Sequence, residues 1–133
     1  MKSFEPVYKK LNELFIETLP AYIQKVNEEH NDGIILTEFE NKQLEEHCSL
    51  LPSFDFTIEE SEYEEKDRIL ENTIFTTGIA INLQKHTENQ FLLLCRYEEA
   101  IEKMFNENQD ILFWQDVTIL KMKNNKIIIR ITI

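Results

Sequence analysis

The amino-acid sequence predicts an α+β fold, a two-layer sandwich with two helices packed on one face of an antiparallel sheet of about four or five strands. Three observations predict it. Apolar residues recur at three- and four-residue spacing near residues 3–26 and 87–106, as in amphipathic helices. Apolar and polar residues alternate near residues 53–60, 72–83 and in the C-terminal stretch, as in half-buried strands. The length suits a single domain, residues 1–133.

The first helix is predicted to begin at Ser3, whose hydroxyl can cap it, and to run to about Val26. Pro20 lacks a backbone N–H donor, so we expect it to kink the helix or to restart it near Leu19. The stretch NEEHNDG then ends the helix, and Gly33 suits the left-handed backbone found at helix ends.

Residues 34–52 fit two descriptions, because IILTEF is compatible with a strand and ENKQLEEHCSLL with a short helix or irregular chain. The pattern becomes clear after Pro52. In the stretch SFDFTIEE, Phe54, Phe56 and Ile58 alternate with polar residues, which predicts a strand with one buried face.

An acidic segment follows, in which residues 59–68 carry six carboxylates against Lys66 and Arg68. Mutual repulsion favours an extended, solvated loop over a packed element. Tyr63 stands among these charges, and a tyrosine ring is a good interface anchor, although a ring lying on its own loop explains it equally well. The loop is our candidate protein interface, formed by Glu60, Glu62, Tyr63, Glu64, Glu65, Lys66 and Arg68.

A long strand is predicted from about Asn72 to Leu83, and Gly78 within it marks a bulge or a close backbone approach. The second helix is expected to start at HTENQ. Thr87 stands three residues before Gln90 there, which is the spacing of a capping box.

The second helix is expected to turn an apolar face to the core and a charged face to water. The apolar face is predicted to contain Leu93, Leu94, Tyr97, Ala100, Ile101 and Met104. The outward face is predicted to contain Arg96, Glu99, Lys103 and Asn106. Glu99 lies four residues before Lys103, as in a weak helical ion pair.

The C-terminal stretch WQDVTILKMKNNKIIIRITI predicts a β-hairpin, because Asn124 and Asn125 tolerate the positive φ of a tight turn. Trp114 is expected in the core or at a sheet edge, since tryptophan is highly buried on average. A free strand so rich in isoleucine would aggregate, so we expect it inside the sheet. One face of that strand would carry Ile127, Ile129, Ile131 and Ile133.

The amino-acid composition limits the kinds of molecule that this protein is expected to bind. A formal net charge of −11 disfavours both DNA wrapping and an anionic membrane surface, because each attracts cationic proteins. No apolar run approaches the roughly 20 residues that span a bilayer, and the first residues lack a signal-peptide pattern. We expect neither a membrane nor a sequence-specific nucleic acid as partner. Cys48 and Cys95 are unpatterned, which favours buried thiols in a reducing, cytoplasmic setting.

No catalytic signature is present. Gly33 and Gly78 are the two glycines, too few for a phosphate-binding loop. His30, His47 and His86 lack the spacing that brings two imidazoles to one metal. A nucleophilic pair of cysteine and histidine stays open but has no family signature behind it. We therefore expect no enzyme activity and no catalytic residue, cofactor or metal site.

The order of elements resembles the tail-terminator or tail-completion proteins of long-tailed bacteriophages and prophages. The resemblance covers nearly the full chain, through LPAYI in the first helix, NDGIIL, PSFDF, the acidic EESEYEEKDRILENT, IFTTGIAINL, CRYEEAIEKMF and the closing hairpin. It implies a structural virion protein that forms a ring, often a hexamer, and meets tail-tube and neck proteins at the head-proximal end of the tail. The protein would then reside in the virion, or in the host cytoplasm during assembly, and act without catalytic residues.

Under this resemblance, the acidic loop would contact a neighbouring subunit or the tail tube. A competing class is an acidic inhibitor, either an immunity protein or a DNA mimic, that binds a basic toxin or nucleic-acid enzyme. The net charge of −11 fits both classes. A small-molecule enzyme on an α+β scaffold has the least support. Assembly state separates the first two classes, because a ring protein oligomerises and an inhibitor binds its target as a monomer.

Overall fold

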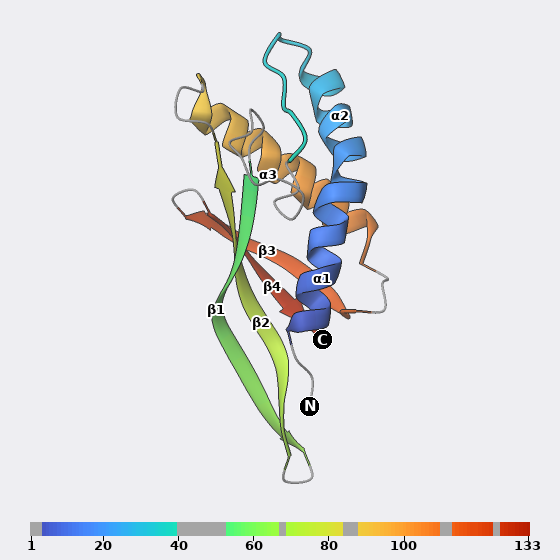
Figure 1. The fold of residues 1–133 in the computed structure, drawn as a ribbon, viewed down its shortest axis with the longest axis vertical. Coiled ribbons are helices and arrows are strands. Elements are labelled where there is room, and N and C mark those ends of the chain that lie inside the picture. The colour runs from blue at the N-terminus through green and yellow to red at the C-terminus, as the bar shows by residue number, and fades with distance from the viewer. Residues whose placement is uncertain (1–3, 40–52, 67–68, 84–87, 110–112, 124–125) are drawn as a thin grey trace, which may run out of the picture.

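Helices cover one face of a four-stranded antiparallel sheet in the described part of this computed structural model (Figure 1). The structure describes residues 4–39, 53–66, 69–83, 88–109, 113–123 and 126–133. Its elements are α1 (Glu5–Glu13), the π-helix η1 (Leu14–Thr18), α2 (Leu19–His30), β1 (Ser53–Lys66), β2 (Ile69–Asn82), α3 (Gln90–Glu107), β3 (Asp116–Lys123) and β4 (Lys126–Thr132).

The sheet has the strand order β1-β2-β4-β3, and each neighbouring pair is antiparallel. The predicted α+β class and the C-terminal hairpin are therefore confirmed. In that hairpin Lys123 pairs with Lys126, and the expected turn residues Asn124 and Asn125 lie outside the described residues. The inward isoleucines of β4 are buried, as expected, and Ile129 is completely so.

The first helix is interrupted, as predicted, and α2 begins at Leu19. Pro20 has no N–H to donate to the carbonyl of Ile16, so the regular hydrogen-bond ladder fails there. In η1 the N–H of Leu19 instead reaches back five residues to the carbonyl oxygen of Leu14. The expected cap residue Ser3 lies outside the described residues, and Phe4 is the N-cap, without a side-chain cap.

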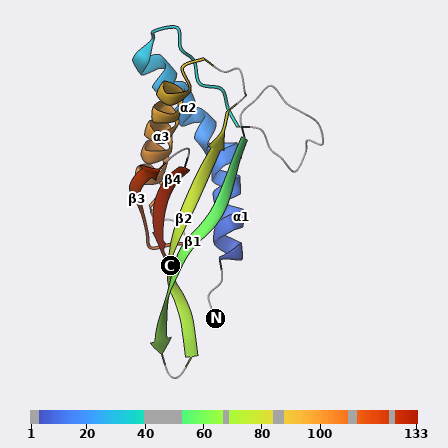
Figure 2. The same ribbon diagram turned by 90° about the vertical axis from the view of Figure 1, so that its left-hand side faces the viewer.

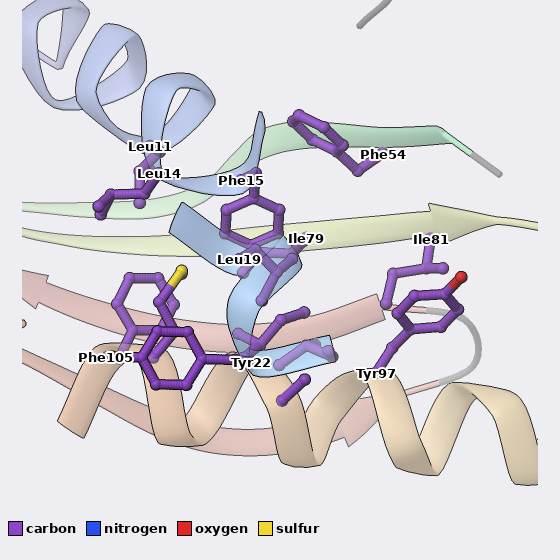
Figure 3. Packing of buried hydrophobic residues seen from close by; sticks show 14 of the residues in the cluster. Leu11, Leu14, Phe15, Leu19, Tyr22, Phe54, Ile79, Ile81, Tyr97 and Phe105 are labelled. Atoms are coloured by element: carbon purple, nitrogen blue, oxygen red, sulfur yellow. The ribbon is translucent and has the colours of Figure 1, made fainter. Parts of the chain in front are cut away.

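Phe15, in the π-helical turn, is the centre of the core (Figure 3). Its ring is fully buried, and its centroid lies 5.0 Å from that of Phe54 and 5.2 Å from that of Phe56, both on β1. Phe105 of α3 approaches it at 6.3 Å. One aromatic side chain thus joins the first helix, the edge strand of the sheet and α3.

Helix α3 buries the predicted apolar face, and Trp114 packs in the core 6.2 Å from Phe105. Its start differs from the prediction. The helix begins at Gln90 after Asn89, which has a positive φ of 58° and makes no side-chain cap. Thr87, the expected cap, lies outside the described residues.

Residues 31–39 form an irregular segment rather than the strand considered for IILTEF, and the helices hold it through side chains. The amide of Asn27 donates to the carbonyl of Leu36 at 3.0 Å and accepts from its N–H at 2.8 Å. The hydroxyl of Tyr97 donates to the carbonyl of Thr37 at 2.7 Å. Leu36 is buried in consequence.

Arg96 corrects a sequence prediction, because it was expected on the outward face of α3 and is instead buried. Its guanidinium donates to both carboxylate oxygens of Asp32 and to the carbonyl of Ile34 at 2.9 Å. Segment 31–39 covers this part of the helix and supplies the counter-charge. The predicted pair of Glu99 and Lys103 is present at 3.5 Å.

We predict that Phe15→Ala lowers the free energy of unfolding by about 3–5 kcal/mol, because it leaves a cavity between the helix and β1. Urea denaturation followed by circular dichroism measures the change. Phe91→Ala is the matched control, since that ring is 77% exposed and its loss should cost under about 0.5 kcal/mol. Equal losses in the two variants would contradict the central role of Phe15.

We also predict that the bond between Asp32 and Arg96 makes stability depend on acidic pH. The Arg96 guanidinium holds the pKa of Asp32 well below its ordinary value. A carboxylate with a lowered folded pKa contributes stability that is complete above its unfolded pKa of about 4 and is lost as pH falls through the folded pKa. Asp32→Asn should therefore lower the urea midpoint at pH 7, and its difference from wild type should shrink below about pH 4.

The control for this pH series is Glu17→Gln, which removes an exposed carboxylate that forms no ion pair with the described residues. Its midpoint should follow the wild-type curve at every pH. A difference between wild type and Asp32→Asn that stays constant from pH 7 to pH 2 would refute the linkage.

Candidate functional site

The acidic segment predicted to be a loop is instead part of a strand. The predicted interface residues Glu60, Glu62, Tyr63, Glu64, Glu65 and Lys66 all lie in β1, and Arg68 lies outside the described residues. β2 starts at Ile69 and supplies backbone partners as far as Lys66, which outweighs the repulsion between neighbouring carboxylates. The solvated character was predicted correctly for Glu60, Glu62 and Glu65, which are exposed.

The β1–β2 hairpin is longer than the rest of the sheet. β4 pairs with β2 only from Ile74 to Ala80, whereas β1 continues to pair with β2 down to Ile69. The part of the hairpin between Ile74 and Ile69 of β2 is therefore a two-stranded arm. Figures 1 and 2 show this arm extending away from the helices and from the other two strands. We call residues 59–66 of β1 the acidic edge, because they form the outer strand of this arm and of the adjoining sheet.

Irregular pairing redirects β1 where the acidic edge begins. The register shifts between Ile58 and Glu60, leaving Glu59 as an extra residue. The carboxylate of Glu59 accepts from the hydroxyl of Thr57 at 2.8 Å and from the ammonium of Lys126 at 3.1 Å. These partners hold the pKa of Glu59 below its ordinary value, with the Thr57 bond as the largest cause.

Gly78 makes this contact possible. A Cβ at position 78 would lie 2.5 Å from Oε1 of Glu59 and 2.9 Å from the hydroxyl oxygen of Thr57. The absence of that carbon lets the Glu59 side chain cross over β2 and reach Lys126 on β4. The close approach that the sequence predicted at Gly78 is present, although a side chain rather than a backbone makes it, and the bulge lies in the facing strand.

Three carboxylates beyond Glu59 have no cationic partner in the described part of the chain. Glu60, Glu62 and Glu65 make no ion pair there, and each is exposed. Tyr63 pairs through its backbone with Asn72 of β2. The structure therefore places Glu60, Glu62 and Glu65 on one outer strand, which leaves the charge of these three side chains available to another molecule.

Sequence reasoning missed a second charged surface, on the β3–β4 hairpin. Lys121 and Lys123 on β3 and Arg130 on β4 are exposed, and the described residues offer none of them an ion pair. The described cations of the helices all have partners, either a carboxylate or, for Lys25, the ring of Tyr22. They are Lys9, Lys10, Lys25, Arg96 and Lys103.

The signal for this basic hairpin was visible in the stretch LKMKNNK, which places three lysines around a turn in an otherwise acidic chain. Alternation along β4 puts Arg130 on the sheet face away from the buried Ile129 and Ile131. One edge of the sheet is thus acidic and the opposite hairpin basic.

Potential metal ligands and reactive side chains also lie among the described residues. No group of three or more histidine, cysteine, aspartate or glutamate side chains among them could hold a metal ion. Cys95 is a half-buried free thiol, and His30 lies on the surface with Nε2 3.0 Å from a carboxylate oxygen of Glu99. Among the helices described, none is both long and apolar enough to cross a membrane.

These features define a class, an acidic two-layer α+β protein with a projecting β-hairpin and two oppositely charged strand edges. Comparison with known proteins adds no closer assignment, since no protein-family model, curated protein or solved structure matches the chain.

We predict that Gly78→Ala lowers the free energy of unfolding by about 1–3 kcal/mol, the usual cost of overpacking, because the new Cβ displaces the Glu59 carboxylate. A double-mutant cycle with Glu59→Ala checks the cause by urea denaturation. The cost of Gly78→Ala should fall when Glu59 is absent, since the nearest clashing atom is then gone. An unchanged cost would show that Glu59 is not the group displaced.

Proposed function

We propose that this protein is a structural component of a phage or prophage virion, a tail terminator that forms a ring at the head-proximal end of the tail tube and joins it to the neck. The supporting observation is the acidic edge, which extends along an arm with exposed carboxylates that the described residues leave without cations. The order of elements that resembles tail terminators supports the same proposal.

A projecting arm of this kind is suited to assembly. Two-stranded ribbons are only marginally stable in water, so packing against a partner stabilises them. An open strand edge also invites non-specific pairing, which the carboxylates of Glu60 and Glu62 oppose by repulsion. A partner that supplies cations removes this repulsion, and charge complementarity then sets the register and rate of association more than its raw affinity.

The competing function is an acidic inhibitor, an immunity protein or DNA mimic that presents its carboxylates to a basic toxin or nucleic-acid enzyme. The exposed acidic edge fits that function as well. The basic hairpin favours assembly instead, because Lys121 and Lys123 would repel a basic target and serve no purpose in charge mimicry.

We predict that the purified protein forms concentration-dependent oligomers that appear as closed rings. Light scattering after size-exclusion chromatography measures the mass over a range of concentrations, and negative-stain electron microscopy shows the shape. A protein that remains monomeric throughout and binds one basic protein tightly would overturn the proposal in favour of the inhibitor.

The acidic edge itself is tested by charge reversal. The variant Glu62→Lys/Glu64→Lys/Glu65→Lys should lose assembly and keep the circular dichroism spectrum of the wild type. Its matched control reverses three exposed carboxylates elsewhere, in Glu17→Lys/Glu38→Lys/Glu102→Lys, and has the same net charge. If both variants assemble like the wild type, the acidic edge takes no part in the ring.

A further inference from the structure

We infer that the partner of the acidic edge is the β3–β4 hairpin of a second copy of this chain, so that copies associate head to tail. This inference rests on the proposed self-assembly and names its contact surface. Glu60 and Glu62 of one copy would face Lys121 and Lys123 of the next.

Unsatisfied charge of both signs supports this pairing. In a chain of net charge −11, cations are scarce, and those described on the helices already have partners. The exposed cations that have neither an ion pair nor an aromatic partner in the described chain lie together on the β3–β4 hairpin. Glu60, Glu62 and Glu65 of the acidic edge also have no ion pair in the described chain, whereas Glu59 binds Lys126. Each surface offers what the other lacks.

Within one molecule the two surfaces meet at the start of the acidic edge, where the Glu59 carboxylate accepts from Lys126, whereas Glu62 on the arm lies too far from Lys121 and Lys123. β1 and β3 are the opposite edges of the sheet, with β2 and β4 between them. Three inter-strand spacings separate them by about 14 Å. Glu62 pairs with Ile74 of β2. Lys123 pairs with Lys126, which in turn pairs with Ala80 of β2. Ile74 and Ala80 are six residues apart, which adds about 20 Å along the strand direction between Glu62 and Lys123. Figure 1 shows the arm extending away from β3 and β4.

The charges also select the symmetry of association. A two-fold contact between two acidic edges would oppose like charges, and so would a contact between two basic hairpins. A contact of unlike surfaces is heterologous, and such contacts repeat until a ring closes or a filament grows. The predicted ring is the closed form of this arrangement.

The backbone supports the same contact. The N–H and carbonyl of Val117 on the outer edge of β3 are already bonded to the side-chain amide of Gln109, at 2.9 and 2.7 Å. From Thr118 to Lys123, the described residues provide no partner to that edge. β1 is likewise an outer strand, so strand-edge hydrogen bonds can form where the lysines meet the carboxylates.

Neutral variants of each surface test the inference. The edge variant is Glu60→Gln/Glu62→Gln, and the hairpin variant is Lys121→Gln/Lys123→Gln. Each alone should raise the dissociation constant for assembly on the order of tenfold or more by sedimentation velocity, because each removes opposed charges from one contact. Raising NaCl from 0.05 to 0.5 M should weaken wild-type assembly in the same direction. Controls are Glu17→Gln/Glu28→Gln and Lys9→Gln/Lys25→Gln, which neutralise charges on the helices.

Mixing the two variants gives the decisive result. The hairpin variant keeps an intact acidic edge, and the edge variant keeps an intact basic hairpin. One wild-type contact can therefore form between them, and the opposite ends of that pair are both neutralised. At a concentration where each variant alone is monomeric, the mixture should form a one-to-one dimer that does not grow.

The outcomes separate this inference from the proposed function. A hairpin variant that assembles like the wild type while the edge variant does not would show that the acidic edge meets another surface, which overturns the inference and leaves self-assembly intact. A mixture that remains monomeric also overturns it. A wild-type protein that is monomeric at all concentrations overturns both. Circular dichroism and urea midpoints confirm that each variant is folded.

Discussion

The packing of Phe15 against Phe54 and Phe56 is the contact on which the rest of the structure depends. It fixes the first half of β1 to the helices, and the register of β1 on β2 then decides which residues face the core. The ring occupies this position because Pro20 interrupts the helix and the π-helical turn accommodates the missing hydrogen bond. Beyond Phe56 no described side chain of β1 is buried, and Ile58 is 49% exposed, so from there the strand can carry charge.

Sequence patterns predicted the parts of this fold that depend on local periodicity. The apolar spacing of α3 identified its buried face, and the alternation in Phe54 and Phe56 identified β1, because each residue's environment there follows from the geometry of its own element. The hairpin of β3 and β4 followed from its two asparagines and its isoleucines for the same reason.

The predictions that were wrong or incomplete depended on partners distant in sequence. Arg96 is buried because Asp32, 64 residues earlier, folds over it in an irregular segment that has no periodicity to reveal it. The acidic segment looks like a loop by its own charges and becomes a strand because β2 pairs with it. The cations of the basic hairpin became informative only when the structure showed that other described cations were already paired. A sequence gives the number of charges, and a structure shows which ones are satisfied.

The bulge at Glu59 and the alternation of the edge beyond it have a consequence for how related chains can differ in length. Glu60 and Glu62 point to the same side only because one residue separates them. Inserting two residues between the bulge and the tip lengthens the hairpin and keeps that side unchanged, whereas inserting one turns every later carboxylate to the opposite side. Divergence of this hairpin should therefore proceed in dipeptide steps, and an odd insertion should survive only with a further register shift, like the one already present between Glu62 and Tyr63, that restores the phase.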